Sequence, residues 1–434
     1  MKAKPWLFRC LATWRMQTIF RKLLTFEEAK QKIDDQFQPV FLGEEDAVLL
    51  EAYNRVLNED VISGLDIPPF NRSTVDGYAV KAQDTFGAEE NQPVTLKVTG
   101  AVSVGEPPNV QLAKGEAVEI VTGAPIPEGA DAVVMVEDTA RDDADLQIFS
   151  SVTKNENIMK KGSDIKKGTT ILKKGQVLGS SEIGVLAALG LTKVRVLKVP
   201  MVAVLSTGAE VTEPGKDLPS GKIYDINAYS ISTAVIESGG KPVYFGVVPD
   251  NKAALSKTLQ SAVASADMVI TSGGVSVGPH DYTPQIVDSL GKPGLVVYGI
   301  AVKPGKPTTV GFVGGKPVFS LPGHPTSALL IFYLLARPMI QRLAGRPVAA
   351  MKMVPAFAGS RMFSAKGRRT FVMVKLEFDK NSRLIAEPVE TGASGAITTL
   401  ANADGFVEIA ENEQFVDIGE EVVVRLFRSS AGKV

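Results

Sequence analysis

The stretch from Asp267 to Leu330 most constrains the fold, because three strand patterns in it each end in a loop rich in glycine or lysine. The strand patterns span 267–270, 295–302 and 317–321, and the loops that follow are Thr271–Tyr282, Lys303–Pro307 and Pro322–Ser327. In an open parallel sheet the carboxyl ends of the strands meet at one edge, where ligands bind. Glycines let backbone N–H groups approach an anion, and helix N-termini add positive potential. The stretch therefore predicts a site for a phosphate-bearing ligand, with a metal or a metal oxyanion nearby.

Strand and helix patterns also alternate around this stretch, between residues 198 and 345. Strands are expected at 202–205 and 243–248, and helices at 228–237, from Asp250 to about 264, at 283–290 and from Thr326 onward. This alternation is typical of a doubly wound sheet of parallel strands. Pro338 is expected to end or kink the helix that starts at Thr326, because proline removes a helical hydrogen bond.

The remaining segments are mostly of β type. Short runs punctuated by glycine and proline fill residues 93–152 and predict a small all-β insert. Asp76-Gly77, between apolar runs, indicates a hairpin or an exposed loop that carries a carboxylate. Runs at 371–378 and 384–389 predict a hairpin within a C-terminal sheet or barrel. Helices are expected at 25–35 with Thr25 as N-cap, at 46–56 and at 180–189.

Composition excludes several classes of protein. A chain of 434 residues predicts about two to four domains, and a net charge of −1 gives no global nucleic-acid-binding surface. One cysteine and two histidines argue against a disulfide framework and a structural zinc site, and they suit a reducing compartment. Neither a dinucleotide-binding glycine fingerprint nor a P-loop occurs. The longest apolar run, 327–336, is too short to span a bilayer.

The first residues of the chain combine basic and aromatic side chains, with Trp6 and Trp14 among lysines and arginines. Such a segment is compatible with a targeting sequence or a membrane-surface helix. It lacks a clean apolar core and a small-residue cleavage site. These absences favour an over-long start, with Met16 as the initiator, or a disordered tail.

Some candidate residues also have a purely structural interpretation. Asp250 and Asp281 each precede a predicted helix, so capping is the alternative to ligand binding for both. Thr122-Gly123 either closes a strand or aims a hydroxyl at a ligand. The lysines between 160 and 174 are expected on a solvated face, whereas Asp164 among them stays a candidate.

Six motifs in order carry a family resemblance. They are Pro-Pro-Phe-x-x-Ser-x-x-Asp-Gly-Tyr-Ala (68–79), Thr-Gly-Ala-x-x-Pro-x-Gly-Ala-Asp-Ala-Val-Val (122–134), Ser-Thr-Gly-x-Glu (206–210), Ser-Gly-Gly-Val-Ser-Val-Gly (272–278), Lys-Pro-Gly-Lys-Pro (303–307) and Leu-Pro-Gly-x-Pro (321–325). From about Leu23 to its end, the chain resembles the molybdopterin molybdotransferase family, known as MoeA in bacteria and as the E-domain of gephyrin and its plant relative.

The resemblance implies a multidomain α/β plus β fold. It comprises a central MogA-like doubly wound α/β domain, an all-β insert domain, a helical or extended linker domain and a small C-terminal β-barrel. The expected boundaries are 1–22 for an extension or disordered tail, 23–62 and 163–197 for a linker and dimerisation domain, 63–162 for the insert, 198–345 for the molybdopterin-binding domain and 346–434 for the barrel.

The resemblance also implies an activity. Adenylylated molybdopterin is bound, AMP is released in a Mg²⁺-dependent step, and molybdate is inserted to give molybdenum cofactor. The implied assembly is a cytoplasmic homodimer, with the active site between the α/β domain of one subunit and the insert of the other. Implied partners are a molybdopterin adenylyltransferase upstream and molybdoenzyme maturation factors. Neither a nucleic acid nor a membrane span is implied.

The family's functional residues are carried over by motif. The expected catalytic residues are Asp76, Thr122, Asp164, Glu210, Asp250, Asp281 and Lys303, of which Glu210, Asp250 and Asp281 are also the expected metal ligands. The expected substrate-binding residues are Ser272, Gly273, Gly274, Ser276, Lys306, Pro322, Gly323, Pro325, Arg368 and Ser394. Asp76 is the expected proton donor when molybdate loses oxygen.

The chain departs from the family pattern at four positions. Pro279 replaces an acid, His324 an asparagine, Gly299 a lysine and Met373 an arginine. Because one acid and two cations are lost, two alternatives remain. One is a tungstate-preferring paralogue, and the other is a binding or scaffold member of the family with weakened catalysis. A phosphotransferase that acts on an unrelated nucleotide is a third alternative, which the missing nucleotide-binding motifs disfavour.

Overall fold

A computed structural model describes residues 23–274, 282–348, 350–389 and 398–427. The chain divides into two compact units, one comprising Met1–Asp46, Asn54–Val56 and Arg195–Val434 and the other Ala47–Tyr53 and Leu57–Val194. The extension or disordered tail predicted at 1–22 lies outside the described residues. No described helix combines the length and the apolar character that crossing a membrane requires.

The first unit contains a six-stranded sheet. Its strand order is β16 (Lys241–Val248), β13 (Met201–Thr207), β17 (Met268–Ser272), β21 (Lys316–Leu321), β20 (Thr309–Val313) and β18 (Pro293–Tyr298). The first four strands are parallel, as predicted, but β20 is antiparallel to both of its neighbours. The strand expected at 295–302 is divided into β18 and β19 (Val302–Lys303). Because β18 runs in the same direction as β17 and β21, all three still end at the same edge.

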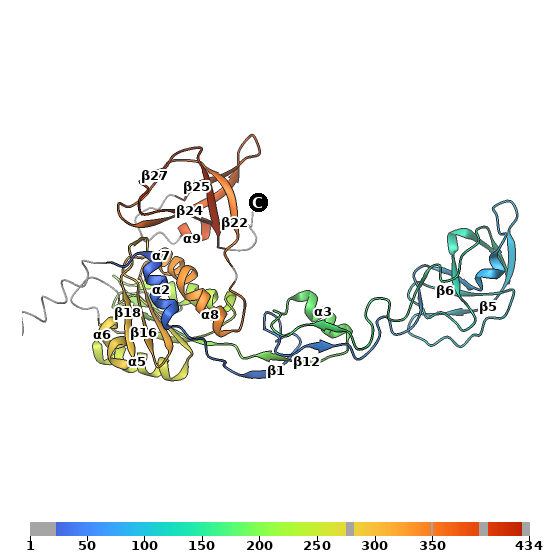
Figure 1. The fold of residues 1–434 in the computed structure, drawn as a ribbon, viewed down its shortest axis with the longest axis horizontal. Coiled ribbons are helices and arrows are strands. Elements are labelled where there is room, and N and C mark those ends of the chain that lie inside the picture. Colours follow the sequence, from blue (N-terminus) through green and yellow to red (C-terminus); the bar gives the residue numbers. More distant parts are fainter. Residues whose placement is uncertain (1–22, 275–281, 349, 390–397, 428–434) are drawn as a thin grey trace, which may run out of the picture. The chain divides into compact units, whose positions relative to one another are not determined.

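Helices cover both faces of this sheet, which confirms the doubly wound α/β class. Alternate residues of β13 point to opposite faces, as the twofold repeat of a strand requires. Val202 and Val204 pack with one apolar cluster, and Ala203 and Leu205 with another. The first cluster contains side chains of α2 (Phe26–Gln36), α4 (Asn227–Glu237), α7 (Pro325–Ile331) and α8 (Arg337–Leu343), and the second those of α5 (Lys252–Ser265) and α6 (Thr283–Leu290) (Figure 1).

Two helix boundaries differ from the prediction. The helix after His324 passes through one π-helical segment, Phe332–Ala336, and continues as α8, so Pro338 does not end it. Pro338 lies just after the π-helical segment, so the change in hydrogen-bond pattern occurs where proline provides no N–H. The cap of α5 is Asn251, whose side chain accepts a hydrogen bond from the Ala254 N–H, so Asp250 is not the helix cap.

A closed five-stranded barrel follows in the same unit, as predicted. Its strands are β24 (Arg369–Phe378), β25 (Leu384–Pro388), β22 (Met353–Ala358), β28 (Glu421–Leu426) and β26 (Gly405–Ile409), and β26 pairs with β24 to close it. The expected hairpin corresponds to β24 and β25. A short helix, α9 (Thr398–Asn402), precedes β26, and β23 (Met362–Phe363) pairs with β27 (Phe415–Val416).

Helix α2 joins the barrel to the α/β sheet. Thr25 caps it as predicted, with Thr25 and Glu28 exchanging side-chain-to-backbone hydrogen bonds. The Phe26 ring lies 5.8 Å from the ring of Phe371 on β24, and the Arg369 guanidinium lies 2.5 Å from Glu27. These aromatic rings belong to the same buried cluster as the first face of the sheet. The barrel and the sheet therefore share a core.

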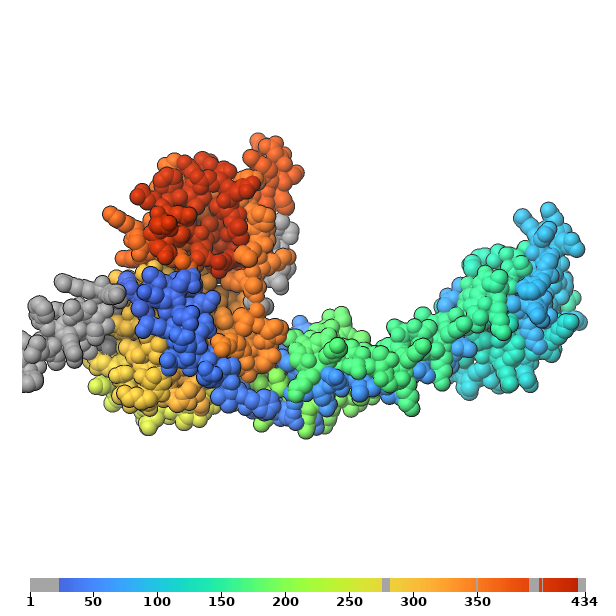
Figure 2. Space-filling view, viewed as in Figure 1, coloured from blue at the N-terminus to red at the C-terminus, as the bar shows by residue number. Residues whose placement is uncertain are grey.

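The second unit contains a six-stranded sheet, which is the predicted all-β insert. Its order is β7 (Ala132–Met135), β4 (Gly77–Val80), β6 (Glu116–Ile120), β5 (Val94–Val102), β9 (Asp145–Ile148) and β8 (Thr139–Asp142). In Figure 2 its residues, coloured cyan to green, gather into one compact mass. Two short ribbons and the predicted helix complete the unit: β2 (Val61–Ile62) with β11 (Thr170–Leu172), β3 (Arg72–Ser73) with β10 (Ile158–Met159), and α3 (Ser180–Ala188).

The helix predicted at 46–56 is absent. The segment contains the end of β1 (Glu44–Val48), which is followed by a turn. Strand β1 pairs with β12 (Lys193–Leu197) in a two-stranded sheet. The Arg195 side chain binds Glu44 and Asp46, so acidic residues that would favour the first turn of a helix instead bind a cation from a distant strand. Tertiary pairing thus overrides the helical propensity of this segment.

Candidate functional site

A pocket of about 930 Å³ opens at the carboxyl edge of the α/β sheet. It is lined by residues from the ends of β13, β17 and β21 and by Lys306 from the loop after β19. Six of the predicted substrate-binding residues lie together here: Ser272, Gly273, Gly274, Pro322, Gly323 and Pro325. Lys306, another predicted ligand residue, also lines the pocket. The three loops of the Asp267–Leu330 stretch therefore contribute to one cavity.

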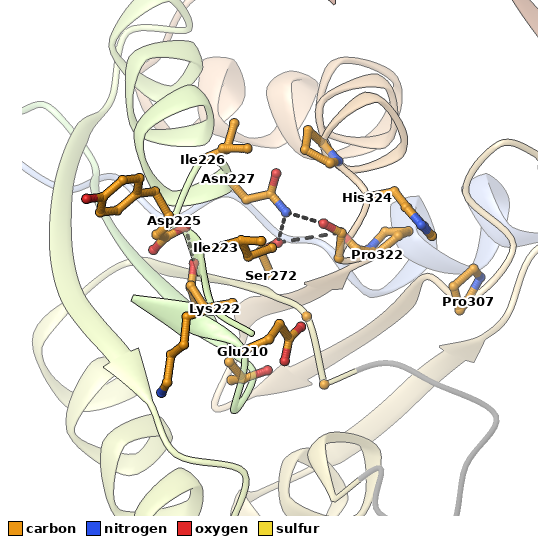
Figure 3. Close-up of a pocket in the computed structure, with 18 of the residues that line it drawn as sticks. Glu210, Lys222, Ile223, Asp225, Ile226, Asn227, Ser272, Pro307, Pro322 and His324 are labelled. Carbon is orange, nitrogen blue, oxygen red and sulfur yellow. Dashed lines mark hydrogen bonds between the residues drawn. The ribbon is translucent and has the colours of Figure 1, made fainter. Parts of the chain in front are cut away.

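A buried asparagine holds two of these loops together. The Asn227 amide nitrogen donates to Ser272 Oγ and to the Gly323 carbonyl, each at 2.7 Å (Figure 3). Asn227 is the first residue of α4 and is 7% exposed. It was not predicted from the sequence, because its partners lie 45 and 96 residues away.

Asp225 is a second pocket residue that was not predicted. Its Oδ1 accepts hydrogen bonds from the Ser206 hydroxyl and the Ala228 N–H, at 2.9 and 3.0 Å, and its Oδ2 accepts one from Tyr244 at 3.1 Å. Asp225 is 4% exposed, and the bond to Ala228 satisfies a donor in the first turn of α4. Burial, followed by the Asp225 charge, raises the pKa of Tyr244 above its ordinary value.

Gly273 and Gly274 form a left-handed turn that larger residues do not fit. Their φ angles are +83° and +63°. A Cβ on Gly273 would lie 2.2 Å from the Thr207 carbonyl oxygen, and one on Gly274 would lie 2.5 Å from Thr207 Oγ1. The Gly273 N–H donates to the Leu321 carbonyl at 3.2 Å, so it extends the sheet. This N–H is therefore bonded within the sheet, and the substrate-binding role of Gly273 stays a prediction.

The second lysine of the Lys-Pro-Gly-Lys-Pro motif has different surroundings from the first. Lys306 lines the pocket, whereas Lys303 is exposed on β19 and pairs with Thr370 of β24. Arg368, the expected barrel ligand, directly precedes that pairing. The structure therefore brings Lys303 and the Arg368 segment side by side, apart from the lining of the pocket.

Two of the expected metal ligands lie at neighbouring strand ends. Glu210 lines the pocket, and Asp250 Oδ2 accepts a hydrogen bond from the N–H of Ala209, the residue before Glu210, at 3.3 Å. Asp281, Ser276 and Ser394 lie outside the described residues. Among the residues that are described, no group of three or more His, Cys, Asp or Glu side chains could hold a metal ion. Glu210 and Asp250 alone would therefore form an incomplete ligand set.

Asp76 and Thr122 interact directly in the insert. Asp76 Oδ1 accepts hydrogen bonds from the Thr122 N–H at 2.6 Å and from the Thr122 hydroxyl at 2.9 Å. These bonds, the backbone one first, lower the pKa of the exposed Asp76 carboxyl below its ordinary value of 3.8. Asp76 is therefore ionised at neutral pH, which does not suit the expected proton donor. Asp164 is exposed, and its backbone N–H donates to the Ile67 carbonyl.

Comparisons with known proteins identify the family. Three family models match the chain in sequence: "MoeA N-terminal region (domain I and II)" at 24–190, "Probable molybdopterin binding domain" at 203–342 and "MoeA C-terminal region (domain IV)" at 355–427. A molybdopterin molybdenumtransferase of Haemophilus influenzae is 34% identical over 414 residues, which cover 94% of this chain and 100% of that protein. The chain belongs to the MoeA family.

Other MoeA relatives agree with this assignment. A molybdopterin molybdenumtransferase of Nostoc is 34% identical over 383 residues, which cover 87% of each chain. Two crystal structures of MoeA proteins from Pyrococcus horikoshii are 43% and 31% identical, with TM-scores of 0.76 and 0.75. Each match covers 94% of this chain and 100% of the crystallised chain. The likeness thus extends over the pocket, the insert and the barrel.

The structure describes three of the four positions at which the chain departs from the MoeA pattern. Gly299 has a φ of +78°, a conformation in which a lysine would be strained. Met373 is 3% exposed in the core shared by the sheet and the barrel, where an arginine would be buried. His324 lines the pocket and precedes α7. Pro279, the fourth departure, lies outside the described residues.

Replacing Asp225 with asparagine is expected to lower the free energy of unfolding by about 1–2 kcal/mol, because an amide NH₂ would face the Tyr244 hydroxyl in place of an acceptor. Chemical denaturation measures this loss. The Tyr244 pKa should also fall toward its ordinary value of 10.0 when the charge is removed, which ultraviolet titration would detect. In a Tyr244→Phe background the substitution should cost less, and an equal cost in both backgrounds would contradict the Asp225–Tyr244 bond.

Proposed function

We propose that this protein is a molybdopterin molybdotransferase. It binds adenylylated molybdopterin, releases AMP and inserts molybdate into the dithiolene to give molybdenum cofactor. The pocket at the carboxyl edge of the sheet is the main support, because it combines glycine turns, hydroxyl groups and Lys306 in a volume of about 930 Å³. Such a combination suits an anionic ligand of nucleotide size.

We further propose that Mg²⁺ takes part in AMP release. Glu210 and Asp250 supply carboxylate oxygens near the pocket, and Asp281 is the expected third ligand. Mg²⁺ suits such a site, since it is commonly bound by one or two carboxylates together with substrate phosphates and water. When bound, the ion would neutralise charge on the pyrophosphate. Lys306 would hold the phosphate in position for cleavage.

The proposed role of Asp76 is that of a base. AMP release by hydrolysis adds a water oxygen to one phosphorus, breaks the bridging P–O bond and frees one proton. An ionised carboxylate accepts that proton more readily than it donates one. The substrate itself can supply the protons for oxygen loss, because two dithiolene thiols bring two protons that leave with one molybdate oxygen as water. An acid from the protein is then unnecessary.

The proposed assembly is a cytoplasmic homodimer in which the Asp76–Thr122 pair of one subunit serves the pocket of the other. A molybdopterin adenylyltransferase supplies the substrate, and molybdoenzyme maturation factors receive the product. Mixing an Asp76→Asn subunit with a Lys306→Gln subunit tests the shared site. Activity should return in the mixture if the two residues act from different subunits, and should stay absent if both belong to the same subunit.

A coupled assay tests the activity itself. The full chain would receive adenylylated molybdopterin and Mg²⁺ with either molybdate or tungstate, and AMP release and metal incorporation would be followed. Release that depends on molybdate and stops when Mg²⁺ is chelated is expected. Dependence on tungstate alone would identify the tungstate-preferring paralogue. Tight substrate binding without AMP release would instead identify a scaffold member of the family.

A further inference from the structure

Lys306 belongs to a loop that two sheets of the first unit hold in place. The loop, residues 299–308, joins β18 to β20, and the Gly299 N–H donates to the Thr308 carbonyl at 2.9 Å, which continues the pairing of those strands. Its middle part leaves the α/β sheet as β19, which pairs with β24 of the barrel. The pocket thus takes its glycine turn from the α/β sheet alone, whereas the loop that carries Lys306 is also bonded to the barrel.

Backbone hydrogen bonds lead from the barrel to Lys306 in two steps. The Arg369 N–H, at the start of β24, donates to the Ala301 carbonyl at 3.0 Å, and the Ala301 N–H donates to the Leu24 carbonyl at 2.7 Å. The adjacent Ile300 N–H donates to the Lys306 carbonyl at 3.0 Å. Ala301 is therefore held between β24 and the segment that precedes α2. A shift of either partner would move Lys306 through Ile300.

The Arg369 side chain fixes α2 to the barrel. Its guanidinium contacts three carboxylates, those of Glu27 on α2 at 2.5 Å, Glu408 on β26 at 3.2 Å and Glu411 at 3.2 Å. It also lies 5.4 Å from the centre of the Phe26 ring. The Arg369 side chain is only 16% exposed, so salt screens these contacts weakly. Charge-assisted hydrogen bonds are roughly twice as strong as neutral ones, which makes this network a firm connection.

We propose that Arg369 is a positioning residue, which sets where Lys306 lies relative to the glycine turn by locking α2 and the barrel around the 299–308 loop. The effect on ligand binding rests on the proposed function, in which Lys306 holds a phosphate group. Arg369 itself need not touch the ligand. A displacement of about 1 Å in a residue that positions the ligand is enough to weaken its action strongly.

Hydrogen exchange of the full chain, followed by mass spectrometry, tests the positioning step without a ligand. In Arg369→Met the amides of residues 299–308 should exchange about tenfold faster or more, because local opening no longer requires the ion pairs to break, while those of β13 should not change. Arg361→Met is the matched control and should leave the loop unchanged. Arg361 also belongs to the barrel, but it pairs with Asp417 and lies 5.0 Å from the Phe415 ring centre, beside β27 rather than β19.

Calorimetric titration with inorganic pyrophosphate tests the effect on the pocket. Arg369→Met and Lys306→Gln should each weaken binding by about tenfold, the size expected for one hydrogen bond to a charged group. The double variant should bind no more weakly than Lys306→Gln alone, because both substitutions remove the same contact. Arg369→Lys keeps the charge and should recover part of the affinity. Arg361→Met should bind as the parent does.

Two results would overturn the inference. One is hydrogen exchange of residues 299–308 that is the same in Arg369→Met and in the parent. The other is a loss of affinity in Arg369→Met that adds fully to that of Lys306→Gln, since Arg369 would then act on a different part of the pocket. If Arg369→Met does not fold, Glu27→Gln takes its place, because the Glu27 side chain is 64% exposed and its substitution removes only the link to α2. The same two criteria then apply, with smaller expected changes.

The two measurements also separate this inference from the proposed function. A parent that binds no pyrophosphate, together with faster loop exchange in Arg369→Met, would remove the proposed role of Lys306 and leave the positioning role of Arg369 in place. A parent that binds pyrophosphate but releases no AMP would remove the proposed activity alone.

Discussion

Gly274→Ala is expected to lower the rate of AMP release by about 100-fold or more, because displacing a positioning loop by about 1 Å is enough for such a loss. The added Cβ would lie 2.5 Å from Thr207 Oγ1, in a turn with a φ of +63°. Thr207 is 2% exposed, so its hydroxyl cannot move away without repacking. Overpacking of this kind should also lower the free energy of unfolding by about 2–3 kcal/mol.

A second substitution makes this prediction specific. Thr207→Ala removes the hydroxyl that the new methyl group would meet, so the double variant should recover much of the activity and stability. Gly273→Ala should not be rescued in this way, since its Cβ would lie 2.2 Å from the Thr207 backbone carbonyl. Single-turnover assays and thermal unfolding would be measured for Gly274→Ala, Gly273→Ala and Thr207→Ala and for the two double variants that combine Thr207→Ala with each glycine substitution.

Gly315→Ala is the control for backbone strain. Gly315 has a φ of +80°, and a Cβ added to it would meet no described atom within 4 Å beyond its own chain neighbours. Its replacement should cost about 1 kcal/mol of stability through backbone strain and leave turnover intact. If Gly274→Ala behaved like Gly315→Ala, the turn would not be sterically required. If Thr207→Ala failed to rescue it, the clash would not be the cause.

The parallel strands of the α/β sheet could be predicted because they are buried on both faces. Runs such as 202–205 and 268–270 are continuously apolar, and glycine-rich loops mark where they end. The antiparallel strand β20 was missed because Thr309–Val313 lies between a proline-rich loop and Gly314-Gly315, which look like one long connection. The prediction of a helix at 46–56 was wrong for the opposite reason. The helical propensity of this segment is strong, but its pairing with a distant strand of the chain outweighs that propensity.

Residues of the site could be predicted from the sequence where the local backbone conformation or the neighbouring residues indicate the residue type. Gly274 is conspicuous because the turn needs a positive φ, and Lys306 because a lysine follows a strand beside glycine and proline. Asp225 and Asn227 were missed because their importance depends on Ser206, Ser272 and Gly323, which only the folded sheet brings near. Likewise, the lowering of the Asp76 pKa depends on hydrogen bonds from Thr122, 46 residues away, so the sequence could identify the carboxylate but not these bonds.

Asp76→Asn is expected to reduce turnover by about 10²–10⁴-fold while AMP and substrate affinities change little, because the variant keeps the shape of the side chain and loses the base. The amide oxygen can still accept the hydrogen bonds from Thr122, so the local fold should be preserved. Single-turnover AMP release and calorimetric titration separate the two effects. Asp164→Asn is a useful comparison, since Asp164 is also exposed in the second unit and the structure gives its carboxylate no such pairing with Thr122.

The pH dependence distinguishes a base from an acid at this position. The folded pKa of Asp76 is lowered below 3.8, so the carboxylate is charged above that value, and its contribution to stability is lost only as pH falls through the lowered pKa. Turnover that depends on the base should therefore stay level as pH falls from about 7 to about 5. Thr122→Val removes the hydroxyl bond but keeps the larger backbone one, and should raise the Asp76 pKa only part of the way, as carbon-13 titration would show. Activity that rises steadily with added acid across this range, and is lost in Asp76→Asn, would restore Asp76 as a proton donor.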